Sequence, residues 1–230
     1  LGQLGNQMFQ YASLKGIANQ NGYNYCIPNH NEIFEDGLGN RLHIELFKPF
    51  VLENFSDLNV QLIDKDRPVV QEGSFHFNEE LFNNCPDWVC LHGFFQTEKY
   101  FKNIEQEIRE DFRFNDDILI PCKEMMDEFG EPPLSLHIRR GDFLINSANH
   151  HNLGLDYYEK ALAEFPMEVP VLIFSDDPEW CSEQELFADD RFLVAEGNSP
   201  YVDMCLMSMC EGHIIANSSF SWWGAWLANS

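Results

Sequence analysis

Basic residues are scarce in this chain of 230 residues, which has 14 Lys and Arg against 38 Asp and Glu and a formal net charge of -24. Binding to nucleic acid or to an anionic membrane surface needs a basic face, so this balance excludes both as bulk partners. A small anionic ligand remains compatible with it, provided that positive charge is gathered locally.

Zinc-site spacing and long apolar runs are missing as well. The 7 cysteines include Cys85 with Cys90 and Cys205 with Cys210, but neither pair is spaced as half of a zinc site. Free cysteines are usually buried, so we expect reduced thiols in a cytoplasmic compartment. No stretch is long and apolar enough to span a bilayer and no signal peptide is recognisable, and peripheral membrane association stays open.

The second half of the chain alternates between strands and helices. Asp177 before Pro178 and Ser199 before Pro200 have the pattern of a helix start. This alternation indicates the α/β class with a parallel, doubly wound sheet. Strands are expected at 134–138, 170–175, 192–195 and 213–216, and helices at 156–165, from Pro178, from Pro200 and at 221–227.

The first half is less regular. Apolar residues at helical spacing predict a helix at 6–21 that ends at Gly22, and strands are expected at 23–27 and 88–92. Thr97 is expected to cap a further helix. One face of that helix is apolar and consists of Phe101, Ile104, Ile108 and Phe112.

A domain boundary is expected in residues 113–133, where Gly130, Pro132 and Pro133 interrupt the pattern. Hydrophobic residues make up 44% of the chain, which is enough for a packed core in each part. We therefore expect two domains, at 1–130 and 131–230.

Polar clusters follow three of the predicted strands. In a parallel sheet the strands' carboxyl ends meet at one edge, where open α/β proteins bind their ligands. Two adjacent guanidiniums, Arg139 and Arg140, have the planar fork that binds phosphate oxygens, so they predict a diphosphate site. The clusters are residues 137–142, residues 175–177 and residues 217–221.

Each member of these clusters also has a structural interpretation. Ser218 and Ser219 begin a helix, where serines either contact a phosphate or cap the helix. Asp176 either accepts hydrogen bonds from a nucleoside or binds Mg²⁺ together with Asp177, which also suits a helix cap. One arginine could serve only as an ion-pair partner, and His137 suits a core position better than proton transfer.

A glycine turn at Gly5, Asn6 and Gln7 opens the first helix and is a second candidate site, since glycine lets the backbone approach a ligand closely. It lacks the spacing of a Walker loop or of a dinucleotide fingerprint, so a purely structural turn stays open. A helix near the C-terminus holds Trp222, Trp223 and Trp226, which are expected to be core aromatics rather than sugar-stacking residues.

Five segments, taken in order, resemble the α-1,2-fucosyltransferases of glycosyltransferase family 11. They span nearly the whole chain. The segments are residues 2–12 (GQLGNQMFQYA), 137–142 (HIRRGD), 155–158 (LDYY), 174–177 (FSDD) and 217–226 (NSSFSWWGAW).

The resemblance implies a GT-B architecture of two Rossmann-like lobes with the active site in the cleft between them. The N-terminal lobe would bind a galactose-terminated glycan and the C-terminal lobe GDP-fucose, for an inverting transfer of L-fucose to the galactose 2-hydroxyl with no cofactor and no obligatory metal. By position, the residues implied at the donor are His137, Arg139, Arg140, Asp176, Ser218, Ser219 and Phe220, with Asn6 and Gln7 on the acceptor side and Arg139, Asn6 and Asp142 in catalysis.

The chain departs from the family at Gln3, where a second glycine is usual, and at Ser230, beyond which family members continue. Both ends look cut, so we expect a fragment with an incomplete C-terminal lobe and leave a terminal anchor open. The general base also stays open. Its candidates are Asp142, His150, His151, Asp156 and a carboxylate in residues 29–87.

Two other interpretations remain at this point. A fucosyltransferase of another linkage would share the arginine loop. A non-catalytic nucleotide-sugar or glycan-binding protein would bind GDP-fucose without turnover.

Overall fold

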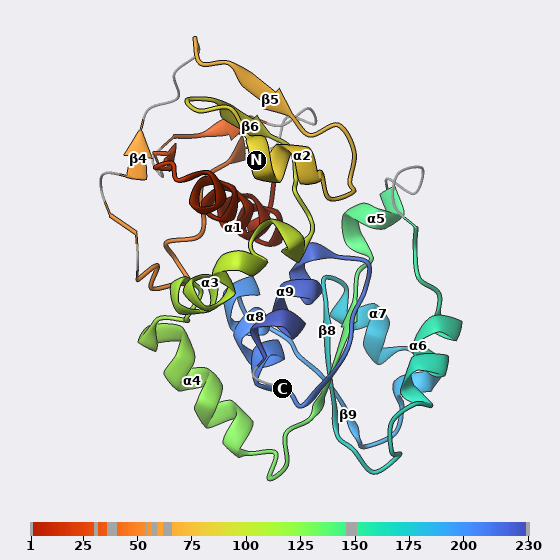
Figure 1. The fold of residues 1–230 in the computed structure, drawn as a ribbon. Coiled ribbons are helices and arrows are strands. Elements are labelled where there is room, and N and C mark those ends of the chain that lie inside the picture. The colour runs from red at the N-terminus through yellow and green to blue at the C-terminus, as the bar shows by residue number, and fades with distance from the viewer. Residues whose placement is uncertain are drawn as a thin grey trace. The chain divides into compact units, whose positions relative to one another are not determined.

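The computed structural model describes residues 2–29, 32–35, 41–53, 55–56, 59–61, 66–145 and 151–228, without the side chains of Gln61, Asp142 and Ile145. The chain forms two compact units, Leu1–Asn115 and Asp116–Ser230 (Figure 1). Each unit has its own buried residues and is described by itself.

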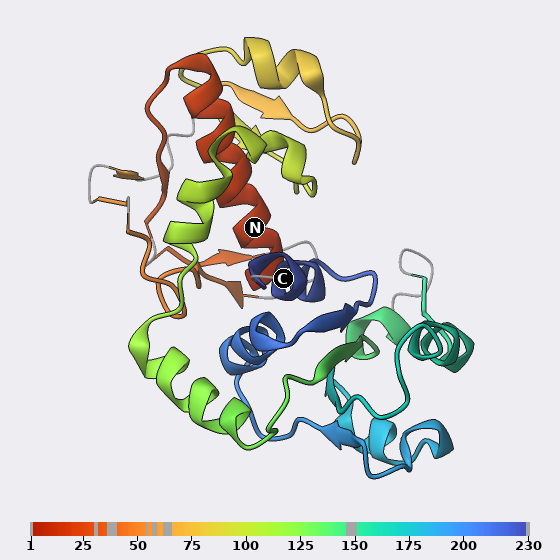
Figure 2. The same cartoon turned by 60° about the horizontal axis from the view of Figure 1, so that its bottom comes forward.

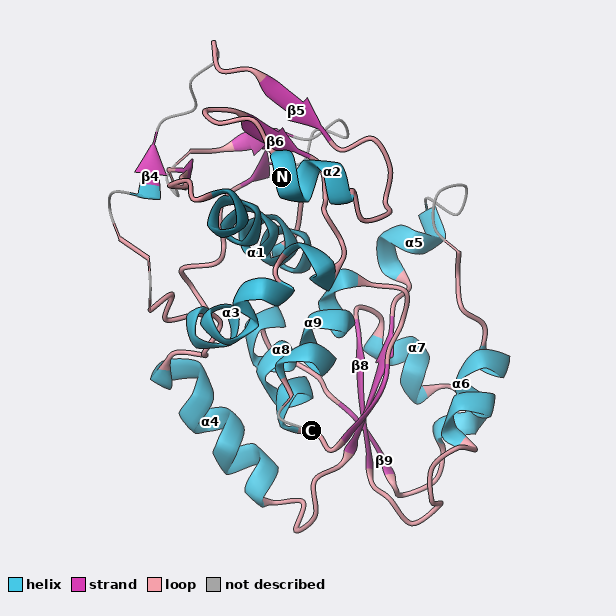
Figure 3. Ribbon diagram, in the orientation of Figure 1, coloured by secondary structure: helices cyan, strands magenta, loops and turns pink. Residues whose placement is uncertain are grey.

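The second unit is built on a four-stranded parallel sheet in the order β10-β7-β8-β9. β7 (Leu134–Ile138) and β8 (Val171–Ser175) lie in the middle, flanked by β9 (Phe192–Val194) and β10 (Gly212–Ile214). The four strands predicted from the sequence are confirmed to within two residues at each end. Figure 3 shows the strands of this sheet crossing the unit together.

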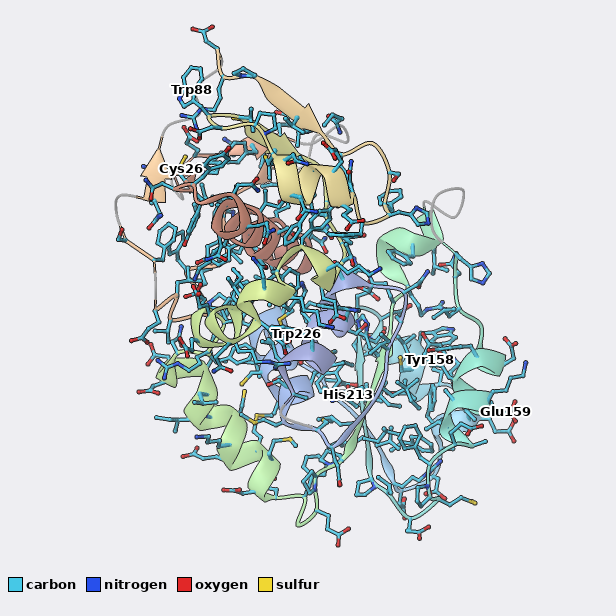
Figure 4. All side chains as sticks on the ribbon, in the orientation of Figure 1. Cys26, Trp88, Tyr158, Glu159, His213 and Trp226 are labelled. Carbon is cyan, nitrogen blue, oxygen red and sulfur yellow. The ribbon has the colours of Figure 1, made fainter. Side chains whose placement is uncertain are left out.

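Helices cover both faces of this sheet, as the alternation predicted. α4 (Asp116–Asp127) and α8 (Pro200–Met209) lie on one side and α6 (Leu155–Leu162) and α7 (Pro178–Ser182) on the other (Figure 2). On α6, buried Tyr158 points to the sheet, and its neighbour Glu159 points to solvent (Figure 4). α5 (Gly141–Ile145), η4 (Glu185–Phe187) and α9 (Ser219–Leu227) complete the unit.

The predicted caps at the helix starts are present. The side chain of Asp177 accepts a hydrogen bond from the Trp180 N–H, and that of Ser199 accepts one from the Val202 N–H. The prolines that follow each cap lack an N–H that a first helical turn would leave unbonded. The caps thus fix where α7 and α8 begin.

The chain divides after Asn115, whereas the sequence pattern suggested 130/131. The difference is due to α4, a helix that the sequence pattern did not predict because prolines at 121, 132 and 133 usually interrupt helices. Its buried Cys122 packs against α8, with its thiol 3.8 Å from the Val202 carbonyl oxygen. Packing of α4 therefore assigns residues 116–130 to the second unit.

The first unit is organised around α1 (Leu4–Asn21), which begins two residues earlier than predicted. Gly22 ends it at φ 70°, a left-handed conformation that glycine adopts without a steric cost. Met8, Tyr11 and Ala12 are fully buried, and Tyr11 packs at 5.6 Å from the ring of Phe112.

Strands of this unit are short and paired. β1 (Ile27–Pro28) is parallel to β4 (Val60–Gln61), and β5 (Val69–Gln71) is parallel to β6 (Cys90–His92). β2 (Phe34–Glu35) and β3 (Arg41–Leu42) pair antiparallel, and α2 (Glu79–Asn84) is a short helix. The strand expected at 23–27 shrinks to Ile27–Pro28, which is a correction to its extent.

The helix expected after Thr97 is broken into η2 (Glu98–Tyr100), η3 (Lys102–Ile104) and α3 (Glu105–Asp111). Thr97 caps η2 as predicted, with its hydroxyl oxygen accepting from the Lys99 N–H at 3.4 Å. The predicted apolar face is buried in spite of the breaks. Within the described ranges, no helix combines the length and hydropathy needed to cross a bilayer.

Candidate functional site at the carboxyl edge of the sheet

The three polar clusters meet at the carboxyl edge of the second unit's sheet. β7 and β8 run in register, with Ile138 opposite Ser175, so the arginines that follow β7 lie beside the aspartates that follow β8. β10 is parallel to β7 on its other side, which brings the serine turn after β10 to the same edge. Parallel topology therefore produces the predicted convergence.

Arg139 forms a partly buried ion pair at this edge. Its Nη1 lies 3.2 Å from Asp176 Oδ2, and the two side chains are 19% and 24% exposed. Its guanidinium carbon is 5.7 Å from the Phe143 ring centroid. A charge that is only partly exposed is screened less by salt than a surface charge, so this guanidinium is suited to bind an anion.

Arg140 is also held by several contacts. Its Nε donates to Asp177 at 3.0 Å, its guanidinium carbon lies 3.7 Å from the Trp180 ring centroid, and its backbone N–H donates to Asp176 at 2.8 Å. These contacts fix both the side chain and the backbone of the loop. Ion pairing with a carboxylate, the predicted structural alternative, is present for both arginines.

Asp176 links the two arginines. Oδ1 accepts from the Arg140 N–H and Oδ2 faces Arg139. Gly141 leaves the space that this carboxylate occupies, since a Cβ there would collide with it. The predicted contact of Asp176 with a nucleoside stays a prediction, and in this structure its carboxylate orients the arginine loop.

The serine turn after β10 begins α9. The Ser218 hydroxyl oxygen accepts from the Phe220 N–H at 3.3 Å, so Ser218 caps the helix as its structural interpretation predicted. Asn217 donates to the backbone carbonyl of His151 at 2.8 Å. The positive end of the helix dipole still lies at this turn, where it favours negative charge. Contacts of Ser219 and Phe220 with a phosphate stay predictions.

His137 is a buried neutral residue beside this turn. Burial, together with the Arg139 charge, lowers the pKa of His137 to about 3. Its ring centroid lies 5.6 Å from that of Phe220, and its Nδ1 has no hydrogen-bond partner among the described residues. A histidine with this pKa is uncharged at neutral pH, so it cannot act there as an imidazolium acid.

Gly5, Asn6 and Gln7 lie within the first turn of α1 in the first unit, not in a turn before the helix, which corrects the predicted glycine turn. Asn6 and Gln7 differ there in exposure. Gln7 is 3% exposed; its Nε2 donates to the carbonyls of Gly2 and His43, and its Oε1 accepts from the Glu45 N–H. Asn6 is partly exposed and accepts from Gln96 Nε2 at 2.8 Å. The acceptor contact of Gln7 stays a prediction, and both N–H groups of its side-chain amide already donate to backbone carbonyls.

The described residues include only some of the candidates for the general base. The Asp142 side chain and all of His150 lie outside the described residues. Asp156 is exposed and 3.4 Å from Lys160, one helical turn away. The catalytic role expected of Asp142 therefore stays a prediction.

The sequence patterns missed two residues that contact predicted site residues, Trp180 and Gln96. Trp180 holds Arg140 from 40 positions along the chain, and Gln96 reaches Asn6 from 90 positions. A parallel sheet with paired guanidiniums and a capped helix start at one edge defines an α/β protein suited to an anionic, nucleotide-like ligand.

The chain belongs to glycosyl transferase family 11, whose family model matches residues 1–230. The predicted family and the enzyme class, a glycosyltransferase, are thereby confirmed. An alpha-1,2-colitosyltransferase of Escherichia coli is 35% identical over 99% of this chain and 86% of its own length. The O-antigen biosynthesis glycosyltransferase WbnK of Escherichia coli is 37% identical over 64% of this chain and 55% of its own length.

A more distant relative is the galactoside alpha-(1,2)-fucosyltransferase 1 of Homo sapiens, 24% identical over 99% of this chain. The chain spans 64% of that relative's length. The colitosyltransferase and the fucosyltransferase carry α-1,2-transferase names, as the resemblance implied.

Solved structures give the fold. The fucosyltransferase NodZ from Bradyrhizobium matches 97% of this chain and 90% of its own with a TM-score of 0.55 at 14% identity. POFUT1 in complex with GDP matches 99% of this chain and 92% of its own with a TM-score of 0.55 at 11% identity. Both support the predicted α/β class and GT-B architecture, which are confirmed.

Proposed function

We propose that this chain is a galactoside 2-α-L-fucosyltransferase that moves L-fucose from GDP-fucose to the 2-hydroxyl of a galactose, with inversion and without a metal. The single observation that carries the proposal is the partly buried Arg139–Asp176 pair at the sheet edge. Family membership supports it, as do the α-1,2 names of the relatives and a POFUT1 structure in complex with GDP-fucose.

In this proposal Arg139 is the cation that tightens on the leaving group. Cleavage of the fucose–phosphate bond builds negative charge on the departing GDP and positive charge on the sugar ring. A fixed guanidinium that binds the developing charge more strongly than the ground state lowers the barrier. Asp176 keeps the guanidinium in place beforehand, so little reorganisation is needed when the bond breaks.

The neighbouring residues have supporting roles in the same proposal. Arg140, stacked on Trp180, holds the loop, and its backbone N–H fixes Asp176. Ser218, Ser219 and Phe220 present the α9 start to the phosphates. Neutral His137 packs beneath Phe220 without adding a charge.

The acceptor hydroxyl needs a base to take its proton. Asp142 is our proposed base, and Asn6 would orient the hydroxyl. Substitution of Asp142 by asparagine is expected to lower kcat and to change the KM for GDP-fucose much less. The plot of kcat against pH should lose its acidic limb. A cytoplasmic location, with peripheral membrane association, is part of the same proposal.

A second candidate is transfer of colitose instead of fucose. It is favoured by one observation, the 35% identity to an enzyme named alpha-1,2-colitosyltransferase along 99% of this chain. Both candidates use the arginine loop in the same way, so they differ only in the sugar that the donor carries.

The test is GDP release from GDP-fucose against a panel of β-galactosides, with EDTA as a control and a colitose donor in parallel. The proposal predicts galactoside-dependent release that EDTA leaves unchanged, and a product with fucose on the 2-position. Another linkage in the product would favour the related fucosyltransferases. Binding of GDP-fucose without galactoside-dependent release would favour a non-catalytic protein.

A further inference from the structure

One face of α1 holds the segment Gly93–Gln96 of the first unit. Gln10 Nε2 donates to the Gly93 carbonyl at 2.8 Å, and Ser13 Oγ donates to the Phe95 carbonyl at 3.2 Å. Asn6 Oδ1 accepts from Gln96 Nε2 at 2.8 Å. Residues 6, 10 and 13 have the spacing of one helical face, so a single helix fixes both ends of the segment.

Glu72 holds the same segment from its other side. Its carboxylate accepts from the Phe94 N–H at 2.7 Å and from the Phe95 N–H at 3.1 Å. Phe95 has φ 52°, a conformation that is unfavourable for a bulky residue and persists only where the surroundings enforce it. A Cβ on Gly93 would collide with Glu72, so glycine is required for this close approach.

The segment presents an aromatic ring and amides to solvent. Phe95 is buried, with its ring edge-on to Tyr100 at 5.5 Å between centroids. Phe94 is 40% exposed, and Gln96 is exposed beside the partly exposed Asn6. An exposed phenyl group therefore stands two residues from a pair of neutral amides on a rigid turn.

We propose that Phe94 and Gln96, together with Asn6, form the binding site for the acceptor sugar, an inference that rests on the proposed galactoside transfer. One face of a pyranose ring carries C–H groups that pack on an aromatic ring, and its hydroxyls both donate to and accept from amides. Neutral amides suit an uncharged glycan better than a phosphate. A turn fixed before binding also loses little conformational freedom when the sugar docks.

The test measures the KM for a β-galactoside and the KM for GDP-fucose in three variants and one control variant. F94A and Q96A are each expected to raise the KM for a β-galactoside by roughly 10-fold, the size of a lost contact in a specificity pocket, while the KM for GDP-fucose is unchanged. F94Y should restore the KM for the galactoside because it keeps the ring. The matched control is F75A, which removes another exposed phenyl group of the first unit and should leave the activity unchanged.

Three outcomes overturn this inference. One is a wild-type galactoside KM in F94A and Q96A. Another is a melting temperature that falls with the loss of affinity and that F94Y does not restore, which would mean a structural role. The third is a rise in the GDP-fucose KM that equals the rise for the galactoside.

Failure of the proposed function can be told apart from failure of this inference. If the wild-type chain releases no GDP with any galactoside, saturation-transfer NMR with methyl β-galactoside tests the binding site alone. The inference predicts sugar signals with the wild-type chain that F94A abolishes and F75A retains. Equal signals from all three proteins would contradict it.

Discussion

The sheet edge of the second unit and the turn of the first unit hold their polar side chains in opposite ways. At the edge, charge meets charge: Arg139 faces Asp176 and Arg140 faces Asp177, all partly exposed. At the turn, the Glu72 carboxylate bonds the backbone, and the exposed side-chain contact is between two neutral amides, Asn6 and Gln96. Because cations suit an anionic ligand and amides suit a hydroxylated one, our proposals assign the donor to the edge and the acceptor sugar to the turn.

The first unit also has an ion pair, but it is enclosed. Lys15 Nζ lies 2.6 Å from Asp111 Oδ2, which also accepts from the Tyr11 hydroxyl at 2.8 Å. Burial and the Asp111 charge raise the pKa of Tyr11, so this tyrosine stays protonated and remains a donor. This cluster is buried and joins α1 to α3, whereas the charges at the sheet edge are partly exposed.

The largest effect on stability is expected from D111A. Removing one partner of a buried pair leaves Lys15 buried beside the more distant carboxylate of Glu107, and costs about 3 kcal/mol in the free energy of unfolding. Urea denaturation measures it. R113A is the matched control because it breaks the exposed pair with Glu53, which is worth no more than about 1 kcal/mol. Similar losses in both variants would remove the distinction by exposure.

R139A is expected to have the largest effect on turnover. Loss of a fixed donor to the leaving group should lower kcat by at least ~10²-fold. Steady-state GDP release measures this. R191A is the control, since Arg191 precedes β9 at the opposite edge and bonds the carbonyls of Pro166 and Met167. A near-normal kcat in R139A would remove the assignment of the charged edge to the donor.

G16A tests how closely the first unit packs η2 on α1. The face that bonds Gly93–Gln96 continues to Gly16, where an added Cβ would collide with the Tyr100 carbonyl. We expect a loss of about 1–3 kcal/mol, the usual cost of overpacking. G73A should be close to neutral because nothing lies within 4 Å of its added Cβ. Thermal denaturation of both variants would show whether this contact is as tight as described.

The smallest effect concerns pH and Asp203 of α8. Burial raises the pKa of Asp203 to about 6 from 3.8, so the folded state binds a proton more strongly than the unfolded chain. The contribution of Asp203 to the free energy of unfolding is therefore fully present below pH 3.8 and is lost as the pH rises toward 6. D203N should be more stable than wild type at pH 8 by about 1 kcal/mol, less than a fully buried carboxyl would give.

The control for this prediction is the same pair of proteins at pH 4, where their stabilities should converge. The Asn198 amide, which donates to Asp203 at 3.0 Å, can donate equally to an asparagine oxygen. A stability difference between the two proteins that is equal at both pH values would mean that titration of this carboxyl does not contribute.

Much of the second unit could be predicted because its signals are local. An apolar run marks each strand, and Asp177 and Ser199 mark helix starts through bonds that span only three residues. Convergence of the polar clusters then follows from parallel topology. The first unit has weaker signals, since its strands are two or three residues long.

Contacts between distant residues could not be predicted. No pattern in a single sequence links Arg140 to Trp180 or Asn6 to Gln96, because side-chain pairing depends on the three-dimensional path of the chain. The same limit hid the structural use of Gln7, whose bonds to His43 and Glu45 cross a loop. The sequence motif predicted that Asn6 and Gln7 lie at the acceptor side. The structure is needed to show that the Gln7 amide is buried and that the Asn6 amide is partly exposed.

Calorimetric titration of GDP into the wild-type chain and into R139A tests the central claim most directly, because it needs neither turnover nor an acceptor. The account predicts that the wild-type chain binds GDP and that R139A binds it at least ~10-fold more weakly, with R191A unchanged, since a charge-assisted contact to phosphate is lost. Equal affinity of GDP for the wild-type chain and R139A would contradict it.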